Sequence, residues 1–396
     1  MAIHKQLTND NHSKTHLFSS RSDVAPFYAM DVLARANQLA EEGACVVSLA
    51  VGQPGAALPL SVREAASRAV MDNVMSYTDA LGRMSARQAV AAHYNEIYGL
   101  DVSPSRIAMT NGSSAGFSLA FLALANAGGR IAITSPGYPA YRNIIRALSM
   151  ECVEISTAGQ LGHMLDLDAL IAEHRKKPID ALLLASPANP TGAALNADQL
   201  GQVIATCKEH GIRFISDEIY HRLRYDGDDI CALSLDDEAI IINSFSKYYC
   251  MTGWRIGWMV VPEAMVRTIE KLGQNLYISA PDLSQRVVPS VFAATADYDV
   301  IKQGYIRNRA VLMEKLPALG FSFAAPPDGA FYAWCDVSAL TNDSMDFAKR
   351  MIEEIHVAAA PGLDFDVQNG HRYMRFSYAG TPDDIDTALE RLARWV

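Results

Sequence analysis

Residues 239–247 read Ala-Ile-Ile-Ile-Asn-Ser-Phe-Ser-Lys, an apolar run that ends in hydroxyl side chains and a lysine. The run is short enough to be a buried strand. The same pattern recurs along the middle of the chain: a short apolar run, a polar turn with Gly or Pro, and a longer segment of helical period. The other runs cover residues 106–110, 130–134, 181–185, 213–216 and 257–261. This alternation predicts β-α units around a mainly parallel sheet.

The rest of the chain differs in pattern and predicts a second, smaller α+β unit. After the last of these runs, a long helical stretch continues to Leu316, and strand-like segments follow at residues 329–334 and 373–377. A chain of 396 residues exceeds the size at which a single hydrophobic core usually keeps growing. We therefore expect two domains, a large one over residues 50–283 and a small one formed by residues 1–49 and 284–396.

Composition and charge exclude several classes of protein. The formal net charge is -10, and no cluster of Lys and Arg supplies the basic face that nucleic acid or an anionic membrane would require. The first 21 residues contain no apolar run of the signal-peptide kind, so a cytoplasmic enzyme is expected. The six cysteines form no C-x-x-C pair and the ten histidines show no metal-ligand spacing, so no metal site is expected.

In an open parallel α/β sheet, ligands bind beyond the carboxyl ends of the strands, so the residues after each run are candidates for a site. The first run is followed by Asn111-Gly-Ser-Ser-Ala-Gly116, which opens a helix. Its backbone N–H groups and the hydroxyls of Ser113 and Ser114 suit a phosphate, although a helix cap is an equal interpretation of this stretch alone. The second run ends in a turn that carries Tyr138, a ring that either stacks on a flat cofactor or only closes the turn.

The next two strand ends carry groups of complementary chemistry. Asn189, in an Asn-Pro turn, offers an amide donor to a phenolic oxygen, although such turns also occur without function. Asp217 directly follows the fourth run, where a carboxylate costs desolvation unless it meets a cation such as a protonated pyridine nitrogen; a helix cap is the alternative. Tyr220 lies on the same side of this segment if the segment turns helical.

Lys247 is poorly explained as a solvated surface charge, because it follows a buried strand among hydroxyls. A partly desolvated amine with a lowered pKa is what an imine-forming nucleophile needs. Eight residues later, Arg255 offers paired donors to a phosphate. Together, the five strand ends supply anion donors, a ring, an amide, a carboxylate and an amine at one edge of the sheet.

From about Val47 to the carboxyl terminus, the chain resembles the class I and II aminotransferases, which are fold-type I pyridoxal 5'-phosphate (PLP) enzymes. The motifs that carry the resemblance are Asn189-Pro-Thr-Gly192, Asp217-Glu-Ile-Tyr220, Ser244-Phe-Ser-Lys247, Gly253-Trp-Arg255 and Arg375. The resemblance implies an α/β fold whose large domain has a mainly parallel seven-stranded sheet flanked by helices, beside a smaller α+β domain. It also implies a ping-pong transaminase that acts on an L-amino acid and a 2-oxo acid.

The resemblance further implies roles for single residues. Lys247 would carry PLP as a Schiff base and act as the general base, while Asp217 would keep the pyridine nitrogen protonated. Asn189 and Tyr220 would hydrogen-bond the phenolate oxygen, and Tyr138 would stack on the ring. The phosphate would be held by Ser113, Ser114, Ser244 and Arg255, and by Tyr77 from the partner subunit of a homodimer.

The substrate's α-carboxylate would bind Arg375, with Gly52 and Asn189 beside it. Candidates for the walls around the substrate's side chain are Phe27, Tyr28 and Phe331. One departure from the family pattern is visible, because Asp366 stands where the loop Pro-Gly-x-x-Phe-Gly usually has its second glycine. A backbone angle that favours glycine would strain an aspartate there.

Three other functions fit parts of the pattern. A PLP-dependent lyase that cleaves C–S bonds by β-elimination would use the same lysine and aspartate, but the stretch Gly253-Trp-Arg-Ile-Gly-Trp258 is more similar to transaminases. A serine hydrolase would use Ser114 in its Gly-x-Ser-x-Gly context, with His371 as the attractive late histidine, and would leave the other strand ends unexplained. A PLP-binding regulator is disfavoured because the chain has no appended DNA-binding segment.

Overall fold

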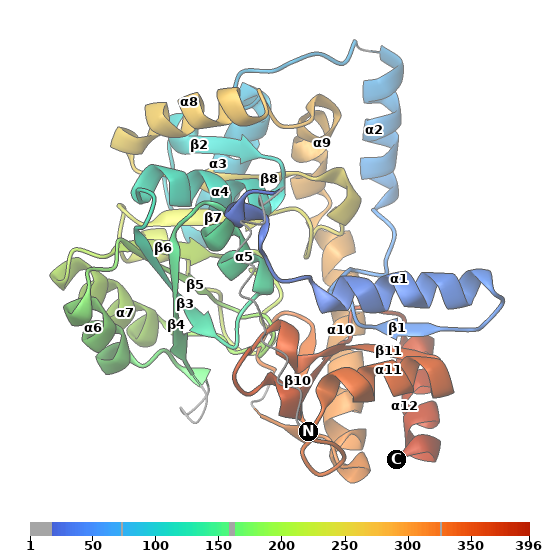
Figure 1. The fold of residues 1–396 in the computed structure, drawn as a ribbon. Coiled ribbons are helices and arrows are strands. Elements are labelled where there is room, and N and C mark those ends of the chain that lie inside the picture. The colour runs from blue at the N-terminus through green and yellow to red at the C-terminus, as the bar shows by residue number, and fades with distance from the viewer. Residues whose placement is uncertain (1–17, 73, 158–162, 325–326) are drawn as a thin grey trace, which may run out of the picture.

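The computed structural model describes residues 18–72, 74–157, 163–324 and 327–396. Residues 1–17, the polar amino terminus expected to belong to the small domain, lie outside the described residues. Two sheets organise the chain, one of seven strands and one of five (Figure 1). Among the described residues, no helix has both the length and the apolar character needed to cross a membrane.

The large sheet has the strand order β2-β8-β7-β6-β5-β3-β4. Strand β8 runs antiparallel to its neighbours β2 and β7, and the other paired strands are parallel. The strands are β2 (Ile107–Thr110), β3 (Arg130–Ser135), β4 (Glu151–Ser156), β5 (Ala181–Ala185), β6 (Arg213–Asp217), β7 (Ile240–Ser244) and β8 (Gly257–Val260). This confirms the predicted fold class, and all of these strands except β4 lie where an apolar run predicted one.

Helices cover both faces of the large sheet. Successive residues of a strand point to opposite faces, and because both sets are apolar here, both faces must be buried. In β7, Ile240 and Ile242 pack into a core that they share with one set of helices. That set is α4 (Gly112–Leu124), α5 (Pro139–Ala147) and α8 (Val266–Leu276). Ile241 packs into the larger core on the other face. The helices of that face include α3 (Met84–Tyr98), α7 (Ala197–Glu209) and α9 (Asp282–Ala293).

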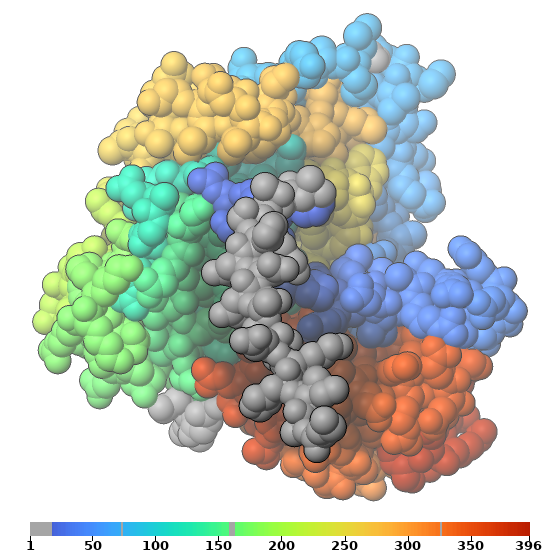
Figure 2. All heavy atoms as spheres, viewed as in Figure 1, coloured from blue at the N-terminus to red at the C-terminus, as the bar shows by residue number. Residues whose placement is uncertain are grey.

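The small sheet has the order β1-β11-β12-β10-β9. Its strands are β1 (Val47–Leu49), β9 (Ser322–Phe323), β10 (Tyr332–Asp336), β11 (Val357–Pro361) and β12 (Tyr373–Ser377). The helices around it are α1 (Tyr28–Glu41), α10 (Thr295–Lys315), α11 (Ser344–Ile355) and α12 (Pro382–Trp395), and α1 lies beside α11 on the surface (Figure 2). The parallel pairing of β1 with β11 supports the proposal that residues before 50 belong to the small domain.

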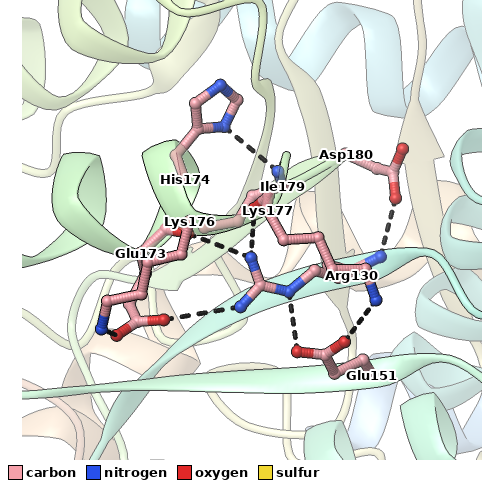
Figure 3. A network of polar contacts seen from close by, with 8 residues as sticks. All are labelled: Arg130, Glu151, Glu173, His174, Lys176, Lys177, Ile179 and Asp180. Atoms are coloured by element: carbon pink, nitrogen blue, oxygen red, sulfur yellow. Dashed lines mark hydrogen bonds and ion pairs between the residues drawn. The ribbon is translucent and has the colours of Figure 1, made fainter.

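The start of strand β3 is fixed by a network around Arg130, a residue that is only 5% exposed (Figure 3). Its backbone N–H donates to Asp180 (2.7 Å), and its guanidinium donates to Glu151 at the start of β4 (2.7 Å). The same guanidinium donates to the main-chain oxygens of Glu173 (3.1 Å) and Lys177, at the end of helix α6 (Leu167–Lys176). These contacts secure the amino ends of the strands, opposite the edge where the candidate site residues gather.

The loop after β11 corrects one expectation from the sequence. Asp366 has a negative φ, so the strain expected from replacing a glycine there does not arise. Its Oδ1 instead accepts hydrogen bonds from the backbone N–H groups of Gln368 and Asn369, both at 2.9 Å. An aspartate therefore stabilises the turn that it occupies.

Candidate active site

A cavity of about 260 Å³ opens at the carboxyl ends of the large sheet's strands, where the small sheet and α1 meet them. Most of the side chains singled out from the sequence line it. The predicted residues in its wall are Phe27, Gly52, Ser113, Ser114, Tyr138, Asn189, Asp217, Tyr220, Lys247, Arg255 and Arg375. Its other lining residues are Ala29, Met30, Leu33, Val51, Gln53, Phe117, Tyr141, Ile219, Ser246, Thr252 and Tyr332.

Lys247 reaches the cavity from the turn after β7. Its Nζ donates a hydrogen bond to the main-chain oxygen of Gly52 at 2.6 Å. Burial lowers the pKa of Lys247 to about 7, and the positive charges of Arg375 and Arg255 contribute to this lowering, while Asp217 opposes them. A lysine with this pKa is a neutral nucleophile and a proton acceptor for a large part of the time at neutral pH.

Asp217, the last residue of β6, is 2% exposed and faces the same cavity. One carboxylate oxygen accepts a hydrogen bond from the backbone N–H of Ile219 (3.1 Å), and the other accepts one from the hydroxyl of Tyr141. Burial raises the pKa of Asp217 to about 6, against the lowering effect of these two donors. Both donors are neutral, so the carboxylate keeps the capacity to pair with a cation inside the cavity.

An anion cradle forms where α4 begins beside Arg255. Gly112 has φ +69°, and a Cβ there would lie 2.6 Å from Nη2 of Arg255, so only glycine lets the guanidinium approach the helix end this closely. Ser113 and Ser114 follow in the first turn of α4, whose N–H groups and positive dipole end favour an anion. Arg255 is held by a hydrogen bond from Nη1 to the main-chain oxygen of Thr252 (3.1 Å).

Ser244, predicted for the same cradle, is buried and its hydroxyl is already engaged. It donates to the main-chain oxygen of Ile256 (3.2 Å) and contacts the hydroxyl of Ser246 (2.9 Å). Ser246 lines the cavity, whereas Ser244 is not among the lining residues of the described chain. The structure therefore presents Ser246 to a ligand and places Ser244 behind it.

Arg375 is held in a fixed orientation at the other side of the cavity. Its guanidinium lies against the rings of Tyr332 (4.3 Å) and Phe365 (4.5 Å), measured from Cζ to each ring centre. Nη1 donates to Oδ1 of Asn189 (2.9 Å), and Nη2 donates to the main-chain oxygen of Ala50 (2.5 Å). Within the described chain, the buried Nε of Arg375 has no partner, which leaves a donor for an anionic ligand.

Aromatic side chains complete the middle of the site. The hydroxyls of Tyr220 and Tyr332 are hydrogen-bonded at 2.7 Å. Tyr138, at the start of α5, lies with its ring centre 5.3 Å from that of Tyr141 and 5.9 Å from that of Phe27. A flat ligand in this cavity therefore has rings on its wall, a carboxylate at one end and hydroxyls at another.

The apolar part of the wall comes mainly from the start of α1. Phe27, Met30 and Leu33 line the cavity. Of the other two wall residues expected from the sequence, Phe331 is fully buried against Tyr220, with ring centres 5.7 Å apart, and Tyr28 is not a lining residue within the described chain.

Two further sequence expectations concern residues outside the cavity wall. Tyr77 is 79% exposed on the surface, as a residue offered to another subunit would be, but the second subunit remains a prediction. His371, the histidine required by a hydrolase that uses Ser114, is exposed in a short helical turn before β12. No histidine of the described chain lines the cavity, so Ser114 has no imidazole base there.

Several functional candidates were missed by reasoning from the sequence. Tyr141 follows Tyr138 by three residues, and this helical spacing could have indicated that both face the same site. Tyr332 and Ser246 lie inside stretches that were noted for other reasons. Met30 and Leu33 carry the i, i+3 spacing of a helix face, but the ligand they face is apparent only in three dimensions.

Comparisons with known proteins agree with this geometry. The family model described as aminotransferase class I and II matches residues 44–392. Valine–pyruvate aminotransferase of Mycobacterium tuberculosis is 42% identical over 95% of this chain and 97% of its own length. A crystal structure of an aminotransferase from the same organism superposes with a TM-score of 0.91 at 41% identity, covering 96% of this chain and 98% of that chain. Aspartate aminotransferase of Thermus thermophilus with maleate gives a TM-score of 0.89 at 30% identity, covering 96% and 99%. All three are aminotransferases, which leaves the lyase and hydrolase alternatives without support.

This family implies PLP as the cofactor, and the residues present fit that group. The buried Asp217 suits a pyridinium nitrogen, Lys247 suits an aldehyde carbon, and the cradle around Gly112 and Arg255 suits a phosphate. Among the described residues, no group of three or more His, Cys, Asp or Glu side chains is placed to hold a metal ion.

Proposed function

The chain belongs to the class I and II aminotransferase family and is a transaminase, and from this premise we propose that it transfers the amino group of a neutral aliphatic L-amino acid to a 2-oxo acid such as pyruvate, with PLP as cofactor. The observation that carries this proposal is the composition of the cavity wall. Each cationic side chain that the described chain places in the wall can be assigned to the reaction, the cofactor or the α-carboxylate, and the apolar part of that wall contains no cation for a second carboxylate. The relative at 42% identity is named for valine and pyruvate, which agrees with this choice.

Three cationic side chains of the described chain line the cavity: Lys247, Arg255 and Arg375. We assign Lys247 to the reaction, Arg255 to the cofactor's phosphate and Arg375 to the substrate's α-carboxylate. A dicarboxylic substrate needs a further cation for its second carboxylate, because a buried unpaired charge is costly. An aliphatic side chain instead gains from burial against Phe27 and Leu33.

The cofactor would be held by residues from several strand ends. Ser113, Ser114, Ser246, Thr252 and Arg255 surround the proposed phosphate position. Asp217 would pair with the pyridine nitrogen, Asn189 and Tyr220 would face the phenolic oxygen, and Tyr138 would cover the ring. Once bound, PLP supplies an electron sink for the pair of electrons that the substrate's Cα–H bond leaves behind.

The chain's own residues position the substrate and move the proton. Arg375 binds the α-carboxylate through Nε and its terminal nitrogens, which fixes the Cα–H bond relative to Lys247. Lys247, whose pKa is lowered to about 7, is the side chain that would accept the Cα proton and hold it for return to the product. Because the amino group is held by the enzyme between substrates, the kinetics are expected to be ping-pong.

A homodimer is part of this proposal. Met71 (80% exposed), Val74 (85%) and Tyr77 (79%) lie within a single short stretch at and after the end of α2 (Leu60–Asp72), and exposed apolar side chains gathered in this way are typical of interfaces. Replacing Met71 and Val74 with aspartate should halve the mass measured by light scattering. Val367→Asp, at another exposed valine (57%), is the matched control and should leave the mass unchanged.

The substrate proposal is tested by half-reactions. The PLP-loaded enzyme is mixed with one amino acid at a time, and the change in the cofactor's visible absorption is recorded. Valine and alanine should change the cofactor's absorption. Aspartate and glutamate should react at least tenfold more slowly, because burying their unpaired second carboxylate against the apolar wall costs more than about 1.4 kcal/mol. Faster reaction with aspartate than with valine would overturn the assignment of an aliphatic substrate, and a colourless protein would overturn PLP.

A further inference from the structure

The first turn of helix α1 is held by an acidic side chain from the far end of the chain. Oδ1 of Asp364 accepts a hydrogen bond from the backbone N–H of Tyr28 (2.8 Å), and Oδ2 accepts one from that of Ala29 (2.6 Å). The first N–H groups of a helix have no partner within the helix and require an acceptor from elsewhere. The residue before α1 is Phe27, which provides no side-chain cap, so Asp364 takes the place of one.

The beginning of α1, together with Phe27 just before it, is the part of this segment that faces the cavity. Phe27, Ala29, Met30 and Leu33 all line the cavity, whereas the later turns of the helix contribute no lining residue within the described chain. Burial of Ala29 (1% exposed) next to Phe365 and Trp334 adds an apolar contact at the same place. The position of the apolar wall therefore depends on where Asp364 fixes the beginning of α1.

Asp364 is itself fixed by contacts to the remainder of the active site. It ends a short helical turn, Gly362–Asp364, and is 2% exposed. The guanidinium of Arg142, in α5, donates to its main-chain oxygen. The next residue, Phe365, packs on Arg375 (4.5 Å) and accepts a hydrogen bond from the N–H of Gly137 (3.0 Å). One loop thus joins α1, the carboxylate-binding arginine and the start of α5.

We propose that Asp364 is a positioning residue for substrate selection, because its carboxylate sets the distance between the apolar face of α1 and the substrate's side chain. This inference rests on the proposed function, in which that face receives an aliphatic side chain. Among the described residues, the carboxylate of Asp364 hydrogen-bonds to the first turn of α1 and to no residue assigned to the cofactor or the α-carboxylate, so we expect its replacement to affect chiefly the side chain of the substrate. Substrates that reach the wall depend on Asp364, and substrates that are too short to reach it do not.

The charges around the group are consistent with an anchoring carboxylate. Burial raises the pKa of Asp364 to about 6, while the two amide donors and the nearby Arg375 and Arg142 lower it. At pH 7.5 to 8 the group is therefore mostly ionised, and an ionised carboxylate presents two acceptors to the two N–H groups. Asparagine keeps one acceptor and turns a donor toward the second N–H group.

The test compares Asp364→Asn and Asp364→Ala with Asp366→Asn in the PLP-loaded enzyme at pH 8. Asp366 is the matched control, because it is equally buried (2% exposed) in the same loop but caps Gln368 and Asn369 rather than α1. For each variant, kcat and KM are measured with alanine, 2-aminobutyrate, valine and leucine. In the Asp364 variants, we expect kcat/KM for valine to fall about tenfold because KM rises, a change that corresponds to about 1.4 kcal/mol. The kcat/KM for alanine should change less than twofold.

A second measurement follows α1 directly. Hydrogen exchange of the peptide over residues 27–33 should be faster in Asp364→Asn than in the wild type and unchanged in Asp366→Asn. A Met30→Ala substitution should lower valine selectivity, and combining it with Asp364→Asn should add less than the sum of the two effects, since both act through the same wall.

The outcomes separate a role in selection from a role in stability alone. Equal losses for alanine and valine, or a valine selectivity that stays unchanged while exchange in α1 accelerates, would overturn the role of Asp364 in substrate selection. If Asp364→Ala does not fold, the kinetics and exchange of Asp364→Asn answer the same question. A wild-type enzyme that ignores all four neutral amino acids would instead refute the proposed function, so the two failures are distinguishable.

Discussion

Nζ of Lys247 lies 2.6 Å from the main-chain oxygen of Gly52, a residue 195 positions earlier in the chain. The contact joins the end of β7 in the large sheet to the segment that follows β1 in the small sheet. Gly52 has no room for a side chain, because an added Cβ would lie 1.7 Å from the hydroxyl oxygen of Tyr332. One glycine therefore lets the reactive amine, the small sheet and a hydroxyl of the site approach one another.

The first prediction concerns this glycine. Gly52→Ala forces either the fully buried Tyr332 or the oxygen that binds Lys247 to move, and we expect kcat/KM for valine to fall about a hundredfold, as a displacement near 1 Å can cause. Steady-state kinetics and the melting temperature are to be measured together. Gly304→Ala is the control, since a Cβ there meets nothing within 4 Å, and it should leave both unchanged or slightly raise stability. If Gly52→Ala were fully active, there would have to be room for a methyl group between residue 52 and Tyr332, contrary to the structure.

The second prediction is a pH dependence of cofactor capture. In the cofactor-free enzyme the pKa of Lys247 is lowered to about 7, so the ammonium form prevails below pH 7 and the reactive amine above it. Covalent capture of PLP at residue 247, trapped with borohydride and measured by peptide mass mapping, should rise through pH 7 and level off by about pH 8.

An ordinary lysine would continue to gain reactivity up to about pH 10, so a midpoint above about pH 9 would refute a desolvated amine. The same shift affects stability. Between about pH 7 and pH 10 the unfolded chain holds a proton on this lysine that the folded apoenzyme does not, so this group makes folding more favourable as the pH rises across that interval. Lys247→Met should remove both effects.

The sequence predicted the reactive side chains at the strand ends better than some of the strands and the distant residues that hold those side chains in place. Continuous apolar runs predicted the central strands. Strand β4 was not predicted, because it lies at the edge of the sheet and its sequence, Glu-Cys-Val-Glu-Ile-Ser, alternates polar and apolar residues and forms no continuous apolar run. Strand β11 was not predicted either, because Val357-Ala-Ala-Ala-Pro361 is short and rich in alanine, a residue that favours helices. Its strand form is imposed by pairing with β1 and β12.

The same limit applies to the site. Lys247 and Asp217 stand at strand ends, where local sequence reveals an unusual charge. The contact between Asp217 and Tyr141 joins residues 76 positions apart, and that between Asp364 and Ala29 joins residues 335 apart. The helical spacing of Tyr141 from Tyr138 could indicate that Tyr141 faces the site, but local sequence does not indicate which side chains pair with Asp217 or with the start of α1. Only the packing of the sheets against each other selects them.

The third prediction concerns Tyr141. Its hydroxyl stabilises the ionised form of Asp217, so Tyr141→Phe should raise the pKa of Asp217 further above its present value of about 6. Less carboxylate is then available to a pyridinium, and the dissociation constant of PLP should rise about tenfold near neutral pH, as loss of one hydrogen bond to a charged group allows. Equilibrium dialysis at pH 6 and pH 8 measures it.

The sign of the pH effect distinguishes this mechanism from a loss of packing. Phenylalanine keeps the ring contacts of Tyr141 with Phe117 (5.0 Å) and Tyr138 (5.3 Å), so a packing defect alone would be small and independent of pH. A weakened carboxylate instead gives a larger loss at pH 6, where more Asp217 is protonated, than at pH 8. An equal loss at both pH values would contradict the role given to Tyr141.

The last prediction tests the arginine that binds the carboxylate. Arg375→Lys keeps the positive charge but loses the planar fork and the free Nε, and it leaves one of the two acceptors, Asn189 or Ala50, without its donor. The apparent dissociation constant of valine in the half-reaction should rise about 10- to 100-fold, while the spectrum of the bound cofactor stays the same. Arg372→Lys, on the surface and paired with Asp336 (2.5 Å), is the matched control and should bind valine normally. If Arg375→Lys binds valine as well as the wild type does, the α-carboxylate is held elsewhere, and the assignment of the apolar wall to the substrate's side chain must be abandoned with it, since both depend on the same placement of the substrate.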